Sequence, residues 1–281
     1  MHDLKTNFTE AEYHGVITTL KLFTLYELVA GKEYWSGRVM RLFPRPDIQR
    51  MANCFSFFEL NIHAPFYNKI NECLGLATEE FYSDYVDNLV LKERMEFINK
   101  IVSSPNELLS LGVFSIVEGA ILYSSFAFLK HFQSEGKNKI INICAGINFS
   151  VRDEALHSLG GSWLFKTLLQ EKKVDQETYA SLTLKINEAA RVIYDHECQL
   201  IDMIFSKGKI DGITDIQLKH FVQSRIDVCL ENLGLEKIYK PSYNPISKWF
   251  YKNINGGQFH DFFTKVGSEY NRDWSESGFA W

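Results

Sequence analysis

Apolar residues recur every three or four positions along most of this chain, which is the period of an amphipathic α-helix. Only six of the 281 residues are proline. The pattern therefore predicts an all-α protein with helices near residues 10–35, 46–75, 78–102, 106–134, 138–171, 175–206 and 214–233. Thr9 followed by Glu12 is typical of a capping box that begins the first helix. The PRPDIQ stretch at 44–49 interrupts the pattern and opens the second helix.

Composition narrows the possible classes of protein. The chain is 46% hydrophobic, enough for one large core, and its net charge of −5 comes without any basic stripe, so we expect no nucleic-acid partner. No uninterrupted apolar run approaches the ~18 residues of a membrane span, and the polar N-terminus has no signal-peptide pattern. The five scattered cysteines include no CxxC pair, which favours a reducing cytosol and a cytoplasmic location.

Glutamate and histidine residues lie within apolar stretches of four of the predicted helices. Carboxylates are rarely buried without a partner, and one such residue could be an ordinary paired core group. The set consists of Glu27, Glu59 with His63, Glu118, and Glu154 with His157. One helix with a single glutamate precedes one with a glutamate and a histidine, and this order occurs twice. The arrangement is typical of helical bundles that hold two iron or manganese ions between carboxylates and histidines.

The stretch ELNIHAPFY at 59–67 departs from the usual Glu-x-x-His spacing, because Leu60 lies three residues before His63. Pro65 cannot donate to the carbonyl of Asn61, and its ring crowds that carbonyl. A π-bulge would relieve the crowding and turn Glu59 toward the position otherwise held by Leu60. We therefore expect a π-bulge here and Glu59 as the ligand. The alternative is a site that lacks one carboxylate.

These segments resemble the small (beta) subunit of class I ribonucleotide reductase, a family with a ferritin-like di-metal fold. The resemblance runs from about residue 10 to 270 and rests on RDEALH at 152–157, VEGAILYSSFAF at 117–128, FELNIHAPFYNKINECLGL at 58–76, NPISKW at 244–249 and FFTKVGSEY at 262–270. It implies a ferritin-like helical bundle with additional helices, which we place at residues 1–266, and a flexible C-terminal tail at 267–281.

The resemblance also implies roles for particular residues. Glu27, Glu59, His63, Glu118, Glu154 and His157 would bind a dinuclear centre, first of all Fe/Fe, with Mn/Fe or Mn/Mn as alternatives. Tyr67 would occupy the radical-bearing position, and Asp153 would accept a hydrogen bond from His63. Glu27 stands where aspartate is common in the family. The tryptophan that family members carry upstream in their electron path has no counterpart, because Trp35 is the first tryptophan and lies in another segment.

The function implied is generation of a radical for ribonucleotide reduction in a separate large subunit, which would bind the C-terminal tail. Trp274, Phe279 and Trp281 would be aromatic anchors in that tail. A homodimer is expected, and a separate N-terminal fragment could complete the subunit. A di-iron oxidase or oxygenase and a truncated, non-catalytic relative remain as alternatives. Outside the site, we interpret YDHE at 194–197 as a solvated or locally paired face, His131 as structural or surface, and Phe114, Phe126, Phe128 and Phe149 as core.

Overall fold

The computed structural model describes residues 6–256, and these form helices joined by short turns. In chain order the elements are α2 (Glu10–Leu28), the π-helix η1 (Val29–Val39), α3 (Met40–Leu42), α4 (Pro46–Phe58), the π-helix η2 (Glu59–His63), α5 (Ala64–Leu74), α6 (Glu79–Asp87), α7 (Leu89–Val102), α8 (Glu107–Ala120), α9 (Tyr123–Lys130), the 3-10 helix η3 (His131–Gly136), α10 (Ile141–Glu171), α11 (Gln176–Ile204), α12 (Asp215–Leu233) and α13 (Pro245–Gly256). Residues 6–256 contain no β-strand, and one isolated bridge joins Ile210 to Ile213. The predicted all-α class is confirmed, whereas the tail expected at 267–281 lies outside the described residues.

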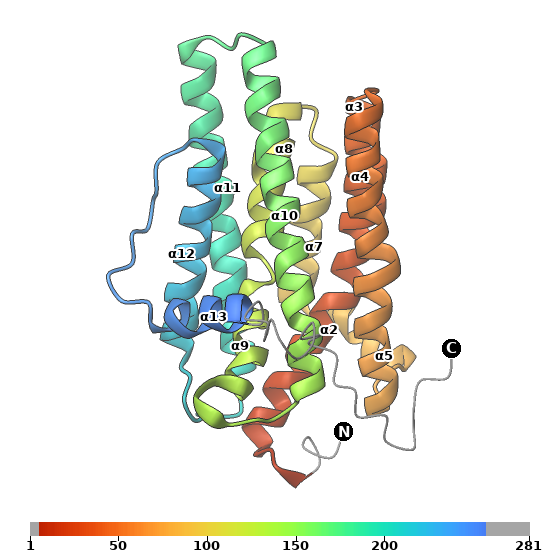
Figure 1. Ribbon diagram of the computed structural model, residues 1–281, viewed down its shortest axis with the longest axis vertical. Coiled ribbons are helices and arrows are strands. Elements are labelled where there is room, and N and C mark those ends of the chain that lie inside the picture. The colour runs from red at the N-terminus through yellow and green to blue at the C-terminus, as the bar shows by residue number, and fades with distance from the viewer. Residues whose placement is uncertain (1–5, 257–281) are drawn as a thin grey trace, which may run out of the picture.

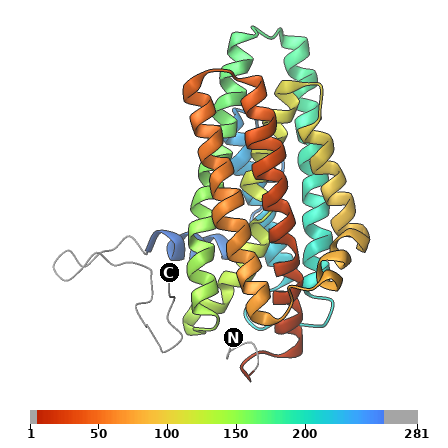
Figure 2. The same cartoon turned by 90° about the vertical axis from the view of Figure 1, so that its right-hand side faces the viewer.

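The long helices run side by side along the long axis of the molecule, and the short α13 lies across them (Figure 1). The view turned by 90° shows the N-terminal helices α2 and η1 beside α4 (Figure 2), and η1 contacts α4 directly. Helix α8 is interior, because α7, α10, α11 and α12 all contact it. This arrangement brings the helices that carry the candidate ligands, α2, η2, α8 and α10, around a shared core.

Helix α8 is apolar on all sides, in keeping with its interior position. Every residue from 110 to 120 is buried. By length and composition, the stretch 107–134 could cross a membrane, with a mean hydropathy of 1.6 over 18 residues, and that whole window is buried inside the bundle. A helix that is hydrophobic all round is typical of the core of a large helical domain. Glu118 is therefore placed deep inside the protein by its own helix.

Helix ends follow the capping signals in the sequence. The Thr9 side chain accepts a hydrogen bond from the Glu12 amide, and the Glu12 carboxylate accepts one from the Thr9 amide, which confirms the capping box. Helix α5 ends at Leu74 and is followed by Gly75, whose φ of 72° is a left-handed conformation that costs glycine little. The predicted ranges 138–171, 175–206 and 214–233 agree with α10, α11 and α12 to within a few residues.

The predicted 10–35 helix has no gap: it passes into π geometry at Val29 and continues to Leu42. Two other predicted helices are broken. The 106–134 helix breaks after Ala120 and resumes as α9 and η3. The 78–102 helix is divided at Asn88, whose side chain accepts from the amides of Val90 and Leu91 and so caps α7. Periodicity alone misses these breaks because the apolar pattern continues through each of them.

The aromatic core is mostly as expected. Phe114, Phe126 and Phe128 are fully buried. The prediction for Phe149 is wrong: its side chain lies on the outer face of α10 and is 38% exposed. His131 is buried, with Nδ1 2.5 Å from the carbonyl oxygen of Phe128, so it is structural rather than a surface residue.

Candidate metal centre

The unusual spacing of Glu59 and His63 is explained by local backbone geometry. Residues 59–63 form a π-helix, and the amide of Ala64 donates to the carbonyl of Glu59, five residues earlier. The widened turn precedes Pro65, as expected from the missing proline N–H. Glu59 and His63 are both buried. The predicted π-bulge is confirmed, and it directs the Glu59 side chain into the core.

A second π-helix, η1, packs against this turn at Gly31. A Cβ atom added at Gly31 would lie 2.7 Å from Cγ of Leu60 and 2.9 Å from Cβ of Glu59. Those distances are shorter than van der Waals contact, so only glycine allows η1 and η2 to approach this closely. Leu60, which occupies the usual carboxylate position of the sequence motif, instead packs against η1. The orientation of the Glu59 side chain is therefore fixed by the π-turn of η2 and by the packing of η1 against that turn.

All six predicted ligands converge in the structure. Two groups of side chains among residues 6–256 each present ligand atoms within 4.8 Å of one another. One group consists of Glu27, Glu59, His63 and Glu154, and the other consists of Glu59, Glu118, Glu154 and His157. Glu59 and Glu154 belong to both groups, so both ions would share these two residues if a pair were bound. All six side chains are at most 2% exposed.

The two histidines present Nδ1 to the carboxylates. Nδ1 of His63 lies 3.2 Å from Glu59 Oε2 and 3.4 Å from Glu154 Oε1. Nδ1 of His157 lies 2.6 Å from Glu59 Oε1 and 3.5 Å from Glu154 Oε2. Neutral imidazole and carboxylate oxygen are ligands that iron and manganese accept. The donor set therefore suits either metal.

Several buried oxygens of this cluster have no hydrogen-bond partner. They are both carboxylate oxygens of Glu27 and both of Glu154. An ionised carboxylate in a dry interior is costly unless a cation or hydrogen-bond donors compensate it. Four carboxylates carry four negative charges, which two divalent cations would balance. The residues present therefore fit a dinuclear metal centre.

The electrostatics of the cluster show the same excess of acidic groups. Burial, followed by the neighbouring carboxylate of Glu59, raises the pKa of Glu27 well above its ordinary value. Burial, followed by Glu154, does the same to the pKa of Glu118. Burial opposes the charged form of His157, but Glu59 and the other carboxylates outweigh it and raise the pKa of His157 well above its usual range. Protons are thus held tightly by these groups, and metal binding has to displace them.

Asp153 and Tyr67 lie on the His63 side of the cluster. His63 Nε2 lies 3.0 Å from Asp153 Oδ2, so with Nε2 protonated the ring donates to Asp153 and presents Nδ1 to the cluster. The Tyr67 hydroxyl donates to Ser150 Oγ at 2.8 Å, and its ring stacks on Phe23 with centroids 4.2 Å apart. Tyr67 is fully buried, and burial followed by the charge of Glu27 raises its pKa well above the usual value.

Sequence reasoning missed two aromatic side chains that contact Glu118. The Trp35 indole donates from Nε1 to Glu118 Oε1 at 2.8 Å, and the Tyr26 hydroxyl lies 3.4 Å from Glu118 Oε2. Both aromatic residues are buried. The position of Tyr26 next to Glu27 was the available signal, whereas Trp35 reaches the site only because η1 packs on α4 and η2.

Two buried arginines hold the break that follows Glu118. Arg225 donates from Nε and Nη2 to the carbonyl of Gly119 at 3.0 and 2.9 Å, and Arg94 donates to the carbonyl of Ile121 at 2.7 Å. These carbonyls lie at the end of α8, where the regular hydrogen-bond pattern stops. Arg94 also pairs with Glu197 at 2.5 Å. The interpretation of residues 194–197 as a solvated or locally paired face is therefore wrong for Glu197, which is fully buried and paired with another helix.

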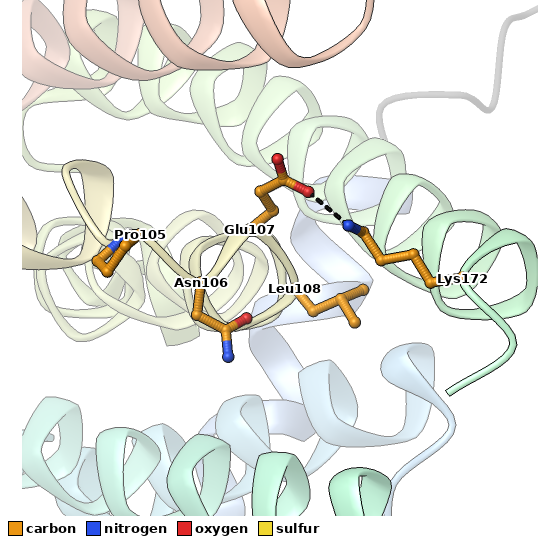
Figure 3. A pocket seen from close by; sticks show the side chains of 5 residues that line it. All are labelled: Pro105, Asn106, Glu107, Leu108 and Lys172. Carbon is orange, nitrogen blue, oxygen red and sulfur yellow. Dashed lines mark ion pairs between the residues drawn. The ribbon is translucent and has the colours of Figure 1, made fainter. Parts of the chain in front are cut away.

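Two depressions on the surface of the described residues lie away from this cluster. One of about 280 Å³ is lined by Pro105, Asn106, Glu107, Leu108 and Lys172, with an ion pair of 2.9 Å between Glu107 and Lys172 (Figure 3). Glu107 begins α8 three turns before Glu118, a separation of roughly 16 Å along the helix axis. A second, of about 430 Å³, is lined by His14, Thr18, Lys21, Asp87, Asn88, Leu91 and Met203. Neither includes a candidate ligand.

The fold and the site together define a ferritin-like helical protein whose core gathers carboxylates and histidines in the pattern of a dinuclear metal centre. Comparison with known proteins agrees. The sequence profile of the family "Ribonucleotide reductase, small chain" matches residues 1–245. The chain therefore belongs to the ribonucleotide reductase small chain family.

Individual relatives are distant but extend over most of the chain. The ribonucleoside-diphosphate reductase subunit beta of Halalkalibacterium halodurans is 27% identical over 99% of this chain and 82% of its own length. The dimanganese(II)-NrdF structure from Streptococcus sanguinis superposes with a TM-score of 0.76 at 20% identity, covering 88% of this chain and 85% of that one. The ribonucleotide reductase R2 subunit from Clostridium botulinum has a TM-score of 0.74 at 21% identity, covering 90% and 81%. These two structures establish the ferritin-like fold.

Proposed function

We propose that this chain is the radical-generating small subunit of a class I ribonucleotide reductase and acts with a separate large subunit. The observation that carries the proposal is the convergence of six buried ligand groups into two overlapping sets that share Glu59 and Glu154. The six positions are those that the resemblance to the family implies, and the family profile covers residues 1–245.

The metal pair would be held by Glu27, Glu59, His63, Glu118, Glu154 and His157, and we propose iron at both positions, with manganese as the alternative. When bound, such a pair supplies one-electron oxidising chemistry in reaction with dioxygen or a reduced oxygen species. The protein contributes the ligand charges, the fixed ring of His63 and the exclusion of water by the surrounding apolar core. The dimanganese state of the Streptococcus sanguinis relative is a reason to test both metals.

We propose Tyr67 as the radical-bearing side chain. If Tyr67 gave one electron to the oxidised metal pair, the buried phenol would lose its proton as well. That proton is held in a hydrogen bond to Ser150 Oγ, whose hydroxyl could pass a proton on but could not retain it. Phe23 stacks on the Tyr67 ring and Phe66 lies edge-on with centroids 5.1 Å apart. These two rings pack on the aromatic ring of Tyr67, and the whole side chain is buried away from water and external reductants. The Asp153–His63 hydrogen bond would connect the centre to the exposed edge of the site, where the Asp153 side chain is 25% exposed.

Electron paramagnetic resonance after aerobic loading with Fe(II), or with Mn(II) and an oxidant, tests this proposal. A tyrosyl signal that disappears in Tyr67→Phe and persists in Tyr26→Phe supports it. Tyr26 is the matched control because it is equally buried and also lies beside the cluster. If the signal disappears in Tyr26→Phe instead, the radical has to be assigned to Tyr26, beside Glu118. Binding of fewer than two metal ions per chain would refute the dinuclear centre.

Assembly and location are further parts of the proposal. The subunit would form a homodimer in the cytoplasm and bind the large subunit through residues 267–281, and a separate N-terminal fragment could complete it. Analytical ultracentrifugation of the full chain tests the dimer. Co-sedimentation with a large subunit, with and without residues 267–281, tests the tail. Equal binding by the two forms would exclude the tail as the docking element.

A further inference from the structure

The carboxylate of Glu118 is contacted differently at its two oxygens. Oε1 accepts a hydrogen bond from the Trp35 indole at 2.8 Å. Oε2 lies 3.9 Å from Nδ1 of His157, on the side of the cluster, and 3.4 Å from the Tyr26 hydroxyl. A carboxylate whose one oxygen is held by a fixed donor has only its other oxygen free to turn toward a cation.

We propose that Trp35 is a positioning residue that holds Glu118 in a single orientation and so sets the metal site shared by Glu118 and His157. Oε1 stays with the indole, and Oε2 is the ligand atom. This inference rests on the dinuclear centre of the proposed function. It adds a residue from η1, an element that supplies none of the six candidate ligands.

The indole ring itself is fixed by its surroundings. Trp35 is fully buried, and its ring makes edge contacts with Phe55 and Tyr34 at centroid distances of 4.8 and 4.9 Å. Tyr34 in turn stacks on Phe114, one turn before Glu118 in α8, at 3.4 Å. The Trp35 ring is also 5.9 Å from the ring of His157. The donor therefore cannot follow Glu118 if that carboxylate rotates, which is what positioning requires.

The effect of Trp35 is confined to one of the two metal positions. Glu118 belongs to the group with Glu59, Glu154 and His157 and is absent from the group with Glu27 and His63. Loss of the indole N–H therefore lowers the metal affinity of the position that contains Glu118 and His157. The affinity of the position that contains Glu27 and His63 stays unchanged. General damage to the fold would weaken both, because Glu59 and Glu154 serve both groups. The two explanations are thus distinguishable by binding alone.

The test replaces Trp35 with 3-benzothienylalanine, an isostere that keeps the ring shape but has sulfur in place of N–H. Trp35→Phe is a second variant that needs no unnatural amino acid, and Trp163→Phe, at an exposed tryptophan of α10, is the matched control. Full-length protein is titrated with Mn(II) without oxygen, and free Mn(II) and coupled pairs are measured by electron paramagnetic resonance. Partners that orient a metal ligand typically change affinity by about 10- to 100-fold.

The expected result is two Mn(II) ions in the unmodified chain and in Trp163→Phe, with unchanged affinities. In both Trp35 variants one ion should bind as before and the other about 10- to 100-fold more weakly, with loss of the coupled signal at intermediate Mn(II). Two unchanged affinities, or equal weakening of both, would overturn the role of Trp35. Fewer than two ions in the unmodified chain would instead refute the proposed function, so the two failures cannot be confused.

Discussion

Replacing Arg94 with methionine should leave the carboxylate of Glu197 buried without its cation. The pair is 2.5 Å apart, both side chains are almost completely buried, and the only other hydrogen bond to this carboxylate among the described residues comes from Ser124 at 2.5 Å. Removing one partner of a buried ion pair typically costs about 3–5 kcal/mol. The freed carbonyl of Ile121, which also accepts from Arg94, adds to that cost. We expect the free energy of unfolding to fall by about this amount.

The assay is urea unfolding of metal-free protein at pH 7, followed by circular dichroism. In the double variant with Glu197→Gln, the buried charge is gone and an amide can still hydrogen-bond to Ser124. We therefore expect the double variant to be more stable than Arg94→Met alone. Lys237→Met, which breaks an exposed 2.9 Å pair with Glu231, is the matched control and should show no measurable change.

Dependence on pH gives an independent check of the same reasoning. Burial already raises the pKa of Glu197, with Arg94 opposing the rise. In Arg94→Met the pKa of Glu197 in the folded state should rise further above its unfolded value. The folded variant then binds more protons between those two pKa values, so its stability falls as pH rises through that window. A loss below about 1 kcal/mol, or a deficit that does not shrink at acidic pH, would refute the argument.

Three further predictions concern packing, capping and metal binding. Gly31→Ala should lower the free energy of unfolding in urea by about 1–3 kcal/mol, because its methyl group would lie less than 3 Å from Leu60 and Glu59. The same substitution should weaken Mn(II) binding. Unchanged binding would show that η1 can move away without displacing Glu59. Thr9→Ala removes the capping box of α2 and should cost about 1 kcal/mol in the same assay, with Thr9→Ser as the conservative control that restores it. Mn(II) at 100 times the dissociation constant of each site should stabilise the protein by about 2.7 kcal/mol per bound ion, or about 5.4 kcal/mol for two ions, and raise the melting temperature. A chelator should reverse the change, and no shift would count against a site in the folded core.

Local signals in the sequence predicted most elements and all the candidate ligands. Helical periodicity, the Thr9 capping box and the long α10, α11 and α12 helices could be read directly, because each depends on neighbouring residues. The π-turn at 59–63 was also accessible, since Pro65 lacks the N–H that an α-helix needs. The ligand set was accessible because carboxylates in apolar helices are rare and their order along the chain is distinctive.

Tertiary structure decided what depends on residues distant in sequence. Periodicity could not reveal that α8 ends at Ala120, because the carbonyls exposed there are bound by Arg94 and Arg225 from other helices. The burial of Glu197 depends on the same long-range arginine. Trp35 became part of the site only through the approach of η1 to η2 across Gly31. A sequence specifies which side chains need a partner, but only the packing of helices determines which partner each one reaches.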